Sequence, residues 1–386
     1  MTKIKRFIRI SALILLALCA VSRAGEAPVV TTMRVPGGGV QPQAAVDDAG
    51  VVHLVYLSGD PSHSDIFYVQ SKDAATFSKP LRVNSQPGSA VAMGTIRGAH
   101  LALGRAGKVY VAWTGSMSAE PKAPGKLMPV LFARSIDGGA SFEPQRNVIQ
   151  TETGPAEGAS VAADDAGSVY VAWHAPMAKG EGEQSRRVLL ARSRDDGKTF
   201  AAETPVSGQA GTCGCCGLRI AVADGSLLAL YRTADQHINR NMTLLRVDPA
   251  TLNPVPQTVG IMQSAVCVMS TSALSKTPAG ELGAWEINGQ IFWSSITAQP
   301  DRLSAMPVPG PAGGRKHPAL AANGAGQILV VWTQGTGWNK GGTIAWQIYE
   351  PSGTPSPNGA GRADKLPVWG APAAFAKRDG SFVIVY

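Results

Sequence analysis

Apolar and polar positions alternate in a short unit that recurs along the whole chain. The unit reads Ala-x-Asp-x-x-Gly-x-apolar-x-apolar-x-aromatic, and its clearest copies are Ala45–Tyr56 and Ala162–Trp173. An apolar strand leads into an Asp/Gly turn, where glycine tolerates a positive φ, and a strand of period two leads out. The unit therefore predicts a β-hairpin.

Seven such hairpins divide the chain evenly. Their turn glycines are Gly50, Gly107, Gly167, Gly225, Gly280, Gly326 and Gly380. Their second strands end in Tyr56, Trp113, Trp173, Tyr231, Trp285, Trp332 and Tyr386. The spacing of 46 to 60 residues between turn glycines is typical of one four-stranded propeller blade. The pattern predicts an all-β fold, a single β-propeller of four-stranded antiparallel blades, with six or seven blades.

The last predicted hairpin reaches Tyr386, so its blade lacks outer strands of its own. The segment Pro28–Val35, which reads PVVTTMRV, is rich in β-branched residues. We expect this segment to add a strand to the last blade and so to close the ring.

A second motif follows several of the hairpins. Pro129–Phe142 and Arg187–Phe200 each give a strand and then Ser-x-Asp-x-Gly-x-Ser/Thr-Phe, and Phe67–Phe77 is a shortened copy. This motif is similar to the Asp-box of sialidase-like propellers. We expect the Asp side chain to cap the turn backbone and the aromatic ring to pack into the blade, which is a structural role.

The first 24 residues have the features of a cleaved signal peptide. A basic start with Lys3, Lys5, Arg6 and Arg9 precedes the apolar run Ile10–Val21, which is too short for a membrane span. Small residues at Ser22 and Ala24 suit a signal peptidase. We therefore expect a periplasmic or secreted mature chain, residues 25–386, that forms one propeller domain without a membrane span.

The predicted leader carries much of the positive charge. It holds five of the 35 Lys and Arg residues and no acidic residue, which leaves 30 basic against 27 acidic residues in the mature chain. The mature chain is therefore nearly neutral and has no run of Lys or Arg, which argues against a nucleic-acid partner.

The cysteines carry the sharpest chemical signal. Cys213, Cys215 and Cys216 precede the fourth hairpin, and Cys267 and Met269 precede the fifth. Loops that lead into adjacent blades lie on one face of a propeller, so we expect these five side chains to meet. Three states stay open: two disulfides, a soft-metal site for copper or zinc, or one disulfide with two free ligands. Met262 and His237 are lesser candidate ligands.

Over nearly its full mature length the chain resembles the sialidase superfamily. That resemblance implies a six-bladed propeller and a site that cleaves terminal sialic acid with an arginine triad, a Tyr nucleophile paired with a Glu, and an Asp acid/base. The chain departs from this pattern. Its Arg34-Val35-Pro36 lies seven residues before the family's first arginine position, which Gln41 holds, and Cys216 and His317 hold two equivalent positions. Sialidase activity is therefore not expected.

Two functional hypotheses remain. The first is a metal-binding or redox propeller built on the cysteines. The second is an exo-sialidase, another glycoside-directed hydrolase or a glycan-binding propeller. Its anion clamp and nearby catalytic groups would be drawn from Arg232, Arg240, Arg315, Tyr231 and Glu286. Expected partners are accordingly a small molecule, a glycan or a metal ion. The chain also resembles an unassigned bacterial subgroup of Asp-box propellers that carries C-x-C-C and a later Cys-x-Met.

Overall fold

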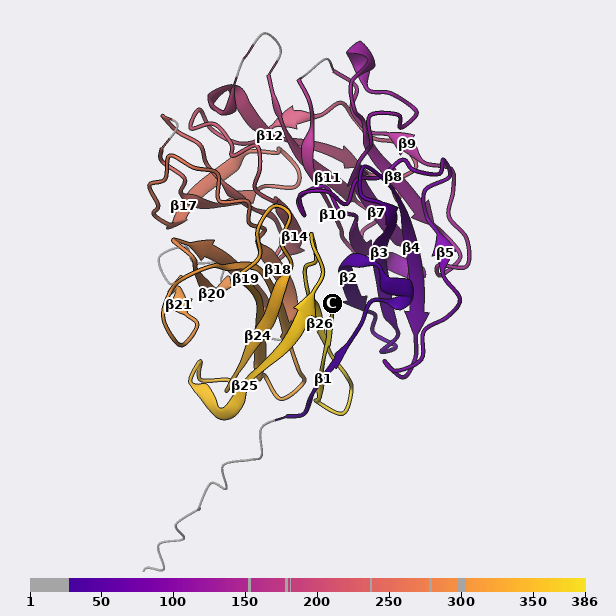
Figure 1. Ribbon diagram of the computed structural model, residues 1–386. Helices are drawn as coiled ribbons and strands as arrows, with labels where there is room; N and C mark the ends of the chain where they lie inside the picture. Colours follow the sequence, from indigo (N-terminus) through magenta and orange to yellow (C-terminus); the bar gives the residue numbers. More distant parts are fainter. Residues whose placement is uncertain are drawn as a thin grey trace, which may run out of the picture.

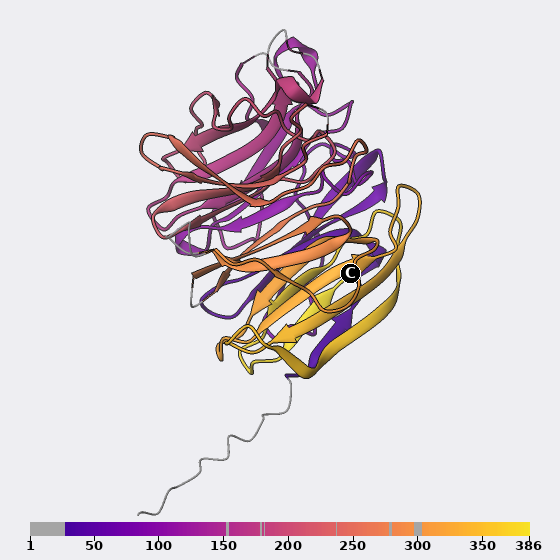
Figure 2. The ribbon, with the colours of Figure 1, turned by 90° about the vertical axis from the view of Figure 1, so that its left-hand side faces the viewer.

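A computed structural model describes residues 28–151, 154–177, 180, 182–236, 238–277, 280–296 and 303–386. Across these residues the strands form seven sheets, six of four strands and one of three. Figure 1 shows the sheets in chain order around a ring, and Figure 2 shows the same ribbon turned by 90°. The predicted all-β propeller of antiparallel blades is confirmed.

The strands of each blade follow one another in sequence. Blade 1 holds β2 (Val40–Val46), β3 (Val52–Asp60), β4 (His63–Ser71) and β5 (Leu81–Arg82). Blade 2 holds β6 (His100–Leu103), β7 (Val109–Thr114), β8 (Val130–Ser135) and β9 (Arg146–Asn147). Blade 3 holds β10 (Glu157–Ala163), β11 (Val169–Pro176), β12 (Arg186–Ser193) and β13 (Thr204–Pro205). Blade 4 holds β14 (Arg219–Ala223), β15 (Ser226–Arg232), β16 (Met242–Val247) and β17 (Pro254–Gly260).

The remaining blades follow the same order. Blade 5 holds β18 (Ala273–Thr277), β19 (Gly280–Ile287), β20 (Gln290–Ile296) and β21 (Met306–Pro307). Blade 6 holds β22 (Arg315–Ala322), β23 (Ile328–Gln334), β24 (Gly342–Tyr349) and β25 (Pro355–Leu366). Blade 7 holds β26 (Ala373–Ala376), β27 (Phe382–Val385) and β1 (Val30–Met33). Four short 3-10 helices are described in the connections: η1 (Pro36–Gly38), η2 (Arg105–Gly107), η3 (Pro124–Lys126) and η4 (Glu183–Ser185).

The ring closes on itself through its innermost strands. Each first strand contacts the first strand of the next blade, and β26 of blade 7 contacts β2 of blade 1. As expected, β1 joins the last hairpin, pairing with β27 in parallel, so the yellow and indigo ends meet in Figure 1. The described residues thus form seven blades rather than the six implied by the resemblance to sialidases, and the hairpin count gave the right number.

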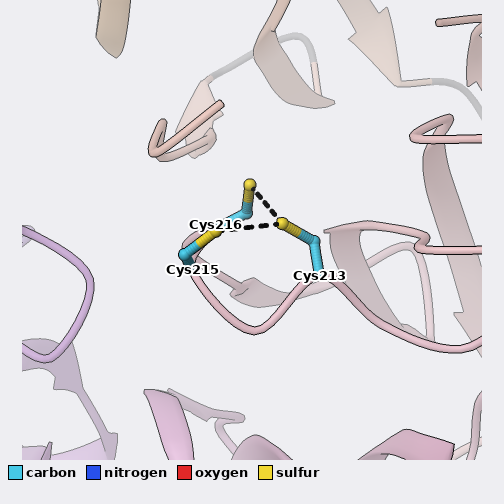
Figure 3. A group of neighbouring side chains, drawn as sticks. All are labelled: Cys213, Cys215 and Cys216. Carbon is cyan, nitrogen blue, oxygen red and sulfur yellow. Dashed lines mark hydrogen bonds between the residues drawn. The ribbon is translucent and has the colours of Figure 1, made fainter. Parts of the chain in front are cut away.

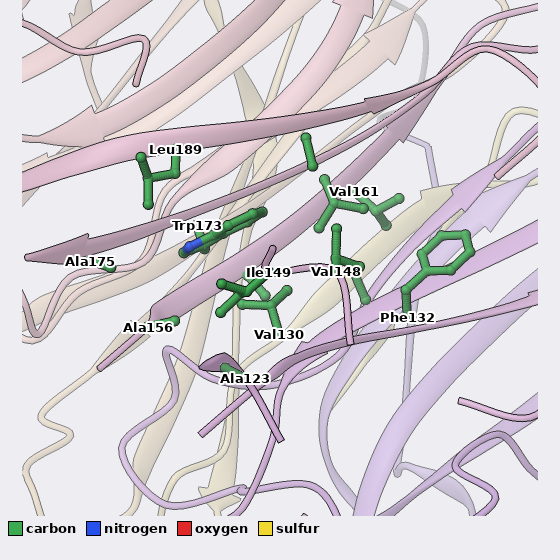
Figure 4. Close-up of a cluster of buried hydrophobic side chains, with 14 of the residues drawn as sticks. Ala123, Val130, Phe132, Val148, Ile149, Ala156, Val161, Trp173, Ala175 and Leu189 are labelled. Atoms are coloured by element: carbon green, nitrogen blue, oxygen red, sulfur yellow. The ribbon is translucent and has the colours of Figure 1, made fainter. Parts of the chain in front are cut away.

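The core is divided into wedges between neighbouring blades. Seven clusters of buried apolar side chains lie among the described residues, one at each blade-to-blade interface. Every cluster contains one of the seven aromatic residues that end the predicted hairpins. Figure 4 shows the cluster between blades 2 and 3, where Trp173 packs against Val130, Ile149 and Leu189. The repeated aromatic is therefore the residue that joins each blade to its neighbour.

The Asp-boxes cap their turns as predicted. The Asp195 carboxylate accepts hydrogen bonds from the Thr199 backbone N–H (2.8 Å) and from the hydroxyls of Ser193 and Thr199 (2.7 Å each). These donors outweigh the effect of burial and hold the pKa of Asp195 well below its usual value. Phe200 packs edge-on against Phe132 of the preceding blade. These contacts support a structural role for the motif.

Residues 1–27, which include the predicted signal peptide, lie outside the described residues. Among the helices described, none is long and apolar enough to cross a membrane.

Candidate functional site

Four sulfur atoms meet where blade 4 adjoins blade 5. Cys215 forms a disulfide with Cys267, with 6.5 Å between the Cα atoms. Cys213 and Cys216 are free thiols, and their Sγ atoms lie 2.8 Å apart. The Sγ atom of Cys213 also lies 3.7 Å from that of Cys215. Figure 3 shows the three side chains of the loop turned toward one another. Of the three states left open by the sequence, this is the one with a single disulfide and two free thiols.

The loop between β13 and β14, which carries three of the cysteines, is held in place by contacts with blades 3, 4 and 5. The Cys213 N–H donates to the carbonyl of Arg232, and the Gly217 N–H donates to the carbonyl of Ser270, both over 3.0 Å. A Cβ atom on Gly217 would lie 3.0 Å from the Thr271 side chain, so glycine allows this loop to approach blade 5. His174 Nε2 lies 3.2 Å from the carbonyl oxygen of Cys216. The loop is therefore anchored to both neighbouring blades.

The two free thiols are buried and differ in acidity. Cys213 is fully buried and Cys216 is 3% exposed, within the apolar cluster between blades 4 and 5. Burial alone would raise the pKa of Cys216, but the hydrogen bond from Cys213 and the charge of Arg232 outweigh it and lower that pKa to about 7. The same hydrogen bond, together with burial, raises the pKa of Cys213 far above its usual range. Cys216 is thus the sulfur that carries negative charge most readily.

Two ion pairs flank the thiols, one fully buried and one with a partly exposed carboxylate. Arg232 and Glu286, each 2% exposed, pair over 2.9 Å. Arg240 donates to Glu183 over 2.8 Å, and the other oxygen of Glu183 accepts the Gly214 N–H of the cysteine loop over 2.8 Å. Burial raises the pKa of Glu286 although Arg232 opposes the shift. Arg232 and Arg240 are therefore each matched by a carboxylate.

The predicted metal-site residues do not all meet. Met262, a lesser candidate, packs in the same cluster as the thiols, and its Sδ accepts a hydrogen bond from Arg232 over 3.1 Å. Met269 instead lines a separate pocket with His317, Trp338 and Trp369. A φ of 48° at Met269 turns the chain at this point. His237 lies outside the described residues.

The five residues predicted for the anion clamp and catalysis do not form one cluster. The Arg315 guanidinium donates to Gln290 (2.6 Å) and lies over the Trp332 ring. Tyr231 is 4% exposed in the cluster between blades 3 and 4, and burial raises its pKa to about 12. Arg232, Arg240 and Glu286 do lie together, as members of the two ion pairs described above. The catalytic role assigned to these five residues stays a prediction.

Sequence reasoning missed Glu183 and Arg186. Glu183 begins η4 in the connection between β11 and β12, and Arg186 is the first residue of β12. With Cys215 and Gly214 they line an open depression of about 280 Å³ beside the disulfide. Burial lowers the pKa of Arg186. After each hairpin, sequence reasoning assigned to the face of the cysteines only the residues just after the aromatic, whereas Glu183 and Arg186 lie further along the chain from Trp173. Their sequence signal is a charged segment in a loop on the same face as the cysteines.

No protein-family profile matches the sequence, and no curated protein matches it significantly. Solved structures do match. A Hadza microbial sialidase aligns with 13% identity and a TM-score of 0.51 over 76% of this chain and 63% of its own. A Penicillium chrysogenum α-L-arabinanase complexed with arabinobiose aligns with 13% identity and a TM-score of 0.53 over 83% of this chain and 96% of its own.

The Trypanosoma rangeli sialidase aligns with 12% identity and a TM-score of 0.53 over 81% of this chain and 56% of its own. The chain therefore spans less than two thirds of the length of the two sialidases. At identities this low the likeness concerns the fold. It shows that the chain shares the β-propeller architecture of these proteins.

Proposed function

We propose that this propeller binds a soft metal ion, Cu(I), between the thiolates of Cys213 and Cys216. The observation that carries the proposal is the buried pair of free thiols, whose Sγ atoms lie 2.8 Å apart with a third sulfur 3.7 Å away, and which must move apart to admit the ion. Thiolates and thioethers are soft ligands that suit Cu(I), zinc and iron–sulfur clusters. Met262 adds a thioether to the wall of the same cluster. The cluster keeps water away from the bound ion and so protects it from oxidation.

The charges around the sulfurs support this assignment. Two thiolates and one Cu(I) leave a single negative charge, and the charges of Arg232 and Arg240 both act on the sulfurs. With Cys215 and Cys267 joined, two thiolates remain for the metal. This favours an ion that accepts two ligands over zinc, whose structural sites use four.

The proposed site belongs to an exported chain. A disulfide beside the site suits an oxidising compartment, in keeping with the signal peptide predicted for residues 1–24. Cleavage after Ala24 is tested by N-terminal sequencing of the chain purified from the periplasm, and an intact Met1 there would contradict it.

Metal binding is tested by anaerobic competition with the chromophoric Cu(I) chelator bathocuproine disulfonate. The wild-type chain is expected to withdraw one Cu(I) per chain from the chelator. Cys213→Ser and Cys216→Ser are each expected to weaken binding at least tenfold, because one of two thiolates is lost.

The matched control is the double variant Cys215→Ser/Cys267→Ser, which removes the disulfide and leaves the inner thiols. It is expected to keep one Cu(I) per chain. Equal copper retention by Cys216→Ser and the wild type would contradict the proposal.

A glycan-binding role is the second candidate, favoured by the pocket that Met269 lines. Two tryptophans, Trp338 and Trp369, line this pocket with Lys316 and His317, and Trp338 is 47% exposed. Indole faces stack on sugar rings, and the aligned arabinanase structure holds arabinobiose. Addition of arabinobiose is expected to change the tryptophan fluorescence of the wild type but not of Trp338→Ala. An identical response of the two chains would exclude this pocket as the binding site.

A further inference from the structure

The four cysteines form two pairs with different access to solvent. The outer pair is Cys215 and Cys267, joined by the disulfide, and Cys215 lines the open depression beside Arg186. The inner pair is Cys213 and Cys216, whose side chains are 0% and 3% exposed. An external thiol can therefore reach the outer pair through the depression, whereas the inner pair is closed to it.

Cys213 is the member of the inner pair whose sulfur lies near the outer disulfide. Its Sγ atom is 3.7 Å from Cys215 Sγ, which belongs to the disulfide, and 2.8 Å from Cys216 Sγ, to which it donates a hydrogen bond. Thiol–disulfide exchange requires a sulfur nucleophile in contact with one sulfur of a disulfide. The contact of 3.7 Å between Cys213 Sγ and Cys215 Sγ meets this requirement. The acceptor of the Cys213 proton is Cys216 Sγ.

We propose that the two pairs act as a relay, in which the outer disulfide and the inner dithiol exchange. In the form that carries one thiolate, Cys213 passes its proton to Cys216 and attacks Cys215 Sγ. A bond forms between Cys213 and Cys215, the bond to Cys267 breaks, and Cys267 leaves as a thiolate.

In the second step Cys216 gives the proton to Cys267 and attacks Cys213 Sγ, and Cys215 leaves as a thiolate. One disulfide bond has been broken and one formed. One thiol proton and one thiolate charge are present before and after, so no external oxidant is required. The oxidised pair has moved from the solvent side to the interior, and two thiols now line the depression.

This relay goes beyond the binding of a metal, since it needs no metal ion. It gives the propeller a second activity, the transfer of two electrons between a thiol in solution and a buried pair. A metal ion on the inner thiolates blocks the exchange, and an inner disulfide removes the metal ligands. The two activities are thus mutually exclusive on one chain.

The relay is tested with two matched three-cysteine variants, Cys216→Ser and Cys213→Ser, each oxidised in air and left with one free thiol. Both are treated with N-ethylmaleimide in native buffer with a metal chelator, and the disulfides and labels are mapped by mass spectrometry. In Cys216→Ser, Cys213 has lost its proton acceptor and is expected to displace Cys267 more slowly than in the wild type. The label then accumulates on Cys267, with a Cys213–Cys215 disulfide. In Cys213→Ser the Cys215–Cys267 disulfide is expected to persist without label on either residue, and the buried Cys216 takes the label only after denaturation.

An intact Cys215–Cys267 disulfide in the Cys216→Ser chain, with Cys267 unlabelled, would overturn the proposal. The wild-type chain gives a second readout that does not depend on how the variants fold. Label on Cys215 and Cys267 with a Cys213–Cys216 disulfide is expected there, and an intact Cys215–Cys267 disulfide without label on either residue contradicts the relay. Because copper is absent throughout, this outcome is independent of the metal-binding assay.

Discussion

Replacing Arg232 by methionine is expected to lower the free energy of unfolding by about 3–5 kcal/mol. The guanidinium is 2% exposed and pairs with Glu286, which is equally buried. It also donates to the carbonyl of Arg240 and to Met262 Sδ. Without the arginine, the Glu286 carboxylate is an unpaired charge between blades 4 and 5. Guanidinium chloride denaturation of the two chains at pH 7 measures the loss.

The loss is expected to depend on pH in a defined direction. Burial already raises the pKa of Glu286, and removal of Arg232 raises it further. The folded variant then keeps the Glu286 proton at pH values where the unfolded chain has lost it. Its stability therefore falls as pH rises above the unfolded pKa of about 4.5, and the deficit is smaller at pH 5 than at pH 8.

A double variant tests whether the unpaired Glu286 carboxylate causes the loss of stability. The double variant Arg232→Met/Glu286→Leu carries neither charge of this pair, so it is expected to recover most of the lost stability. A double variant as unstable as Arg232→Met would show that the uncompensated carboxylate is not the cause.

Trp173→Ala is expected to cost about 3–5 kcal/mol of unfolding free energy. Trp173 is fully buried at the interface of blades 2 and 3, and no neighbouring side chain can fill the space of an indole (Figure 4). The exposed Trp338 is the matched control, because Trp338→Ala removes the same atoms from the surface and is expected to stay within about 0.5 kcal/mol of the wild type. Equal losses in the two variants would contradict the role given to the hairpin aromatics.

The ring was predictable because its signals are local. A turn glycine such as Gly167 and an aromatic such as Trp173 lie within one hairpin, and each hairpin repeats the same contacts, so counting them gave seven blades. The pairing of β1 with β27 was also predictable, since the last hairpin lacked outer strands. Its parallel direction was not predicted, because that depends on how the chain enters blade 1.

The site was predictable only in part. The meeting of Cys213, Cys215, Cys216 and Cys267 follows from their loops in adjacent blades, but the pairing depends on side-chain directions within those loops. Met269 lies two residues after Cys267 and yet reaches a different pocket, because its left-handed backbone conformation turns the chain. Arg315 shares a face with Arg232 in the blade order, but that order does not give distances across the face.

The central claim, a Cu(I) site on Cys213 and Cys216, is tested most directly by copper K-edge X-ray absorption. The wild-type chain is loaded anaerobically with one equivalent of Cu(I), and the Cys213→Ser/Cys216→Ser double variant is treated in the same way. The account predicts a Cu(I) edge with a first shell of sulfur in the wild type and the loss of that shell in the variant. A first shell of nitrogen or oxygen in the wild type, or the same sulfur shell in both chains, would contradict it.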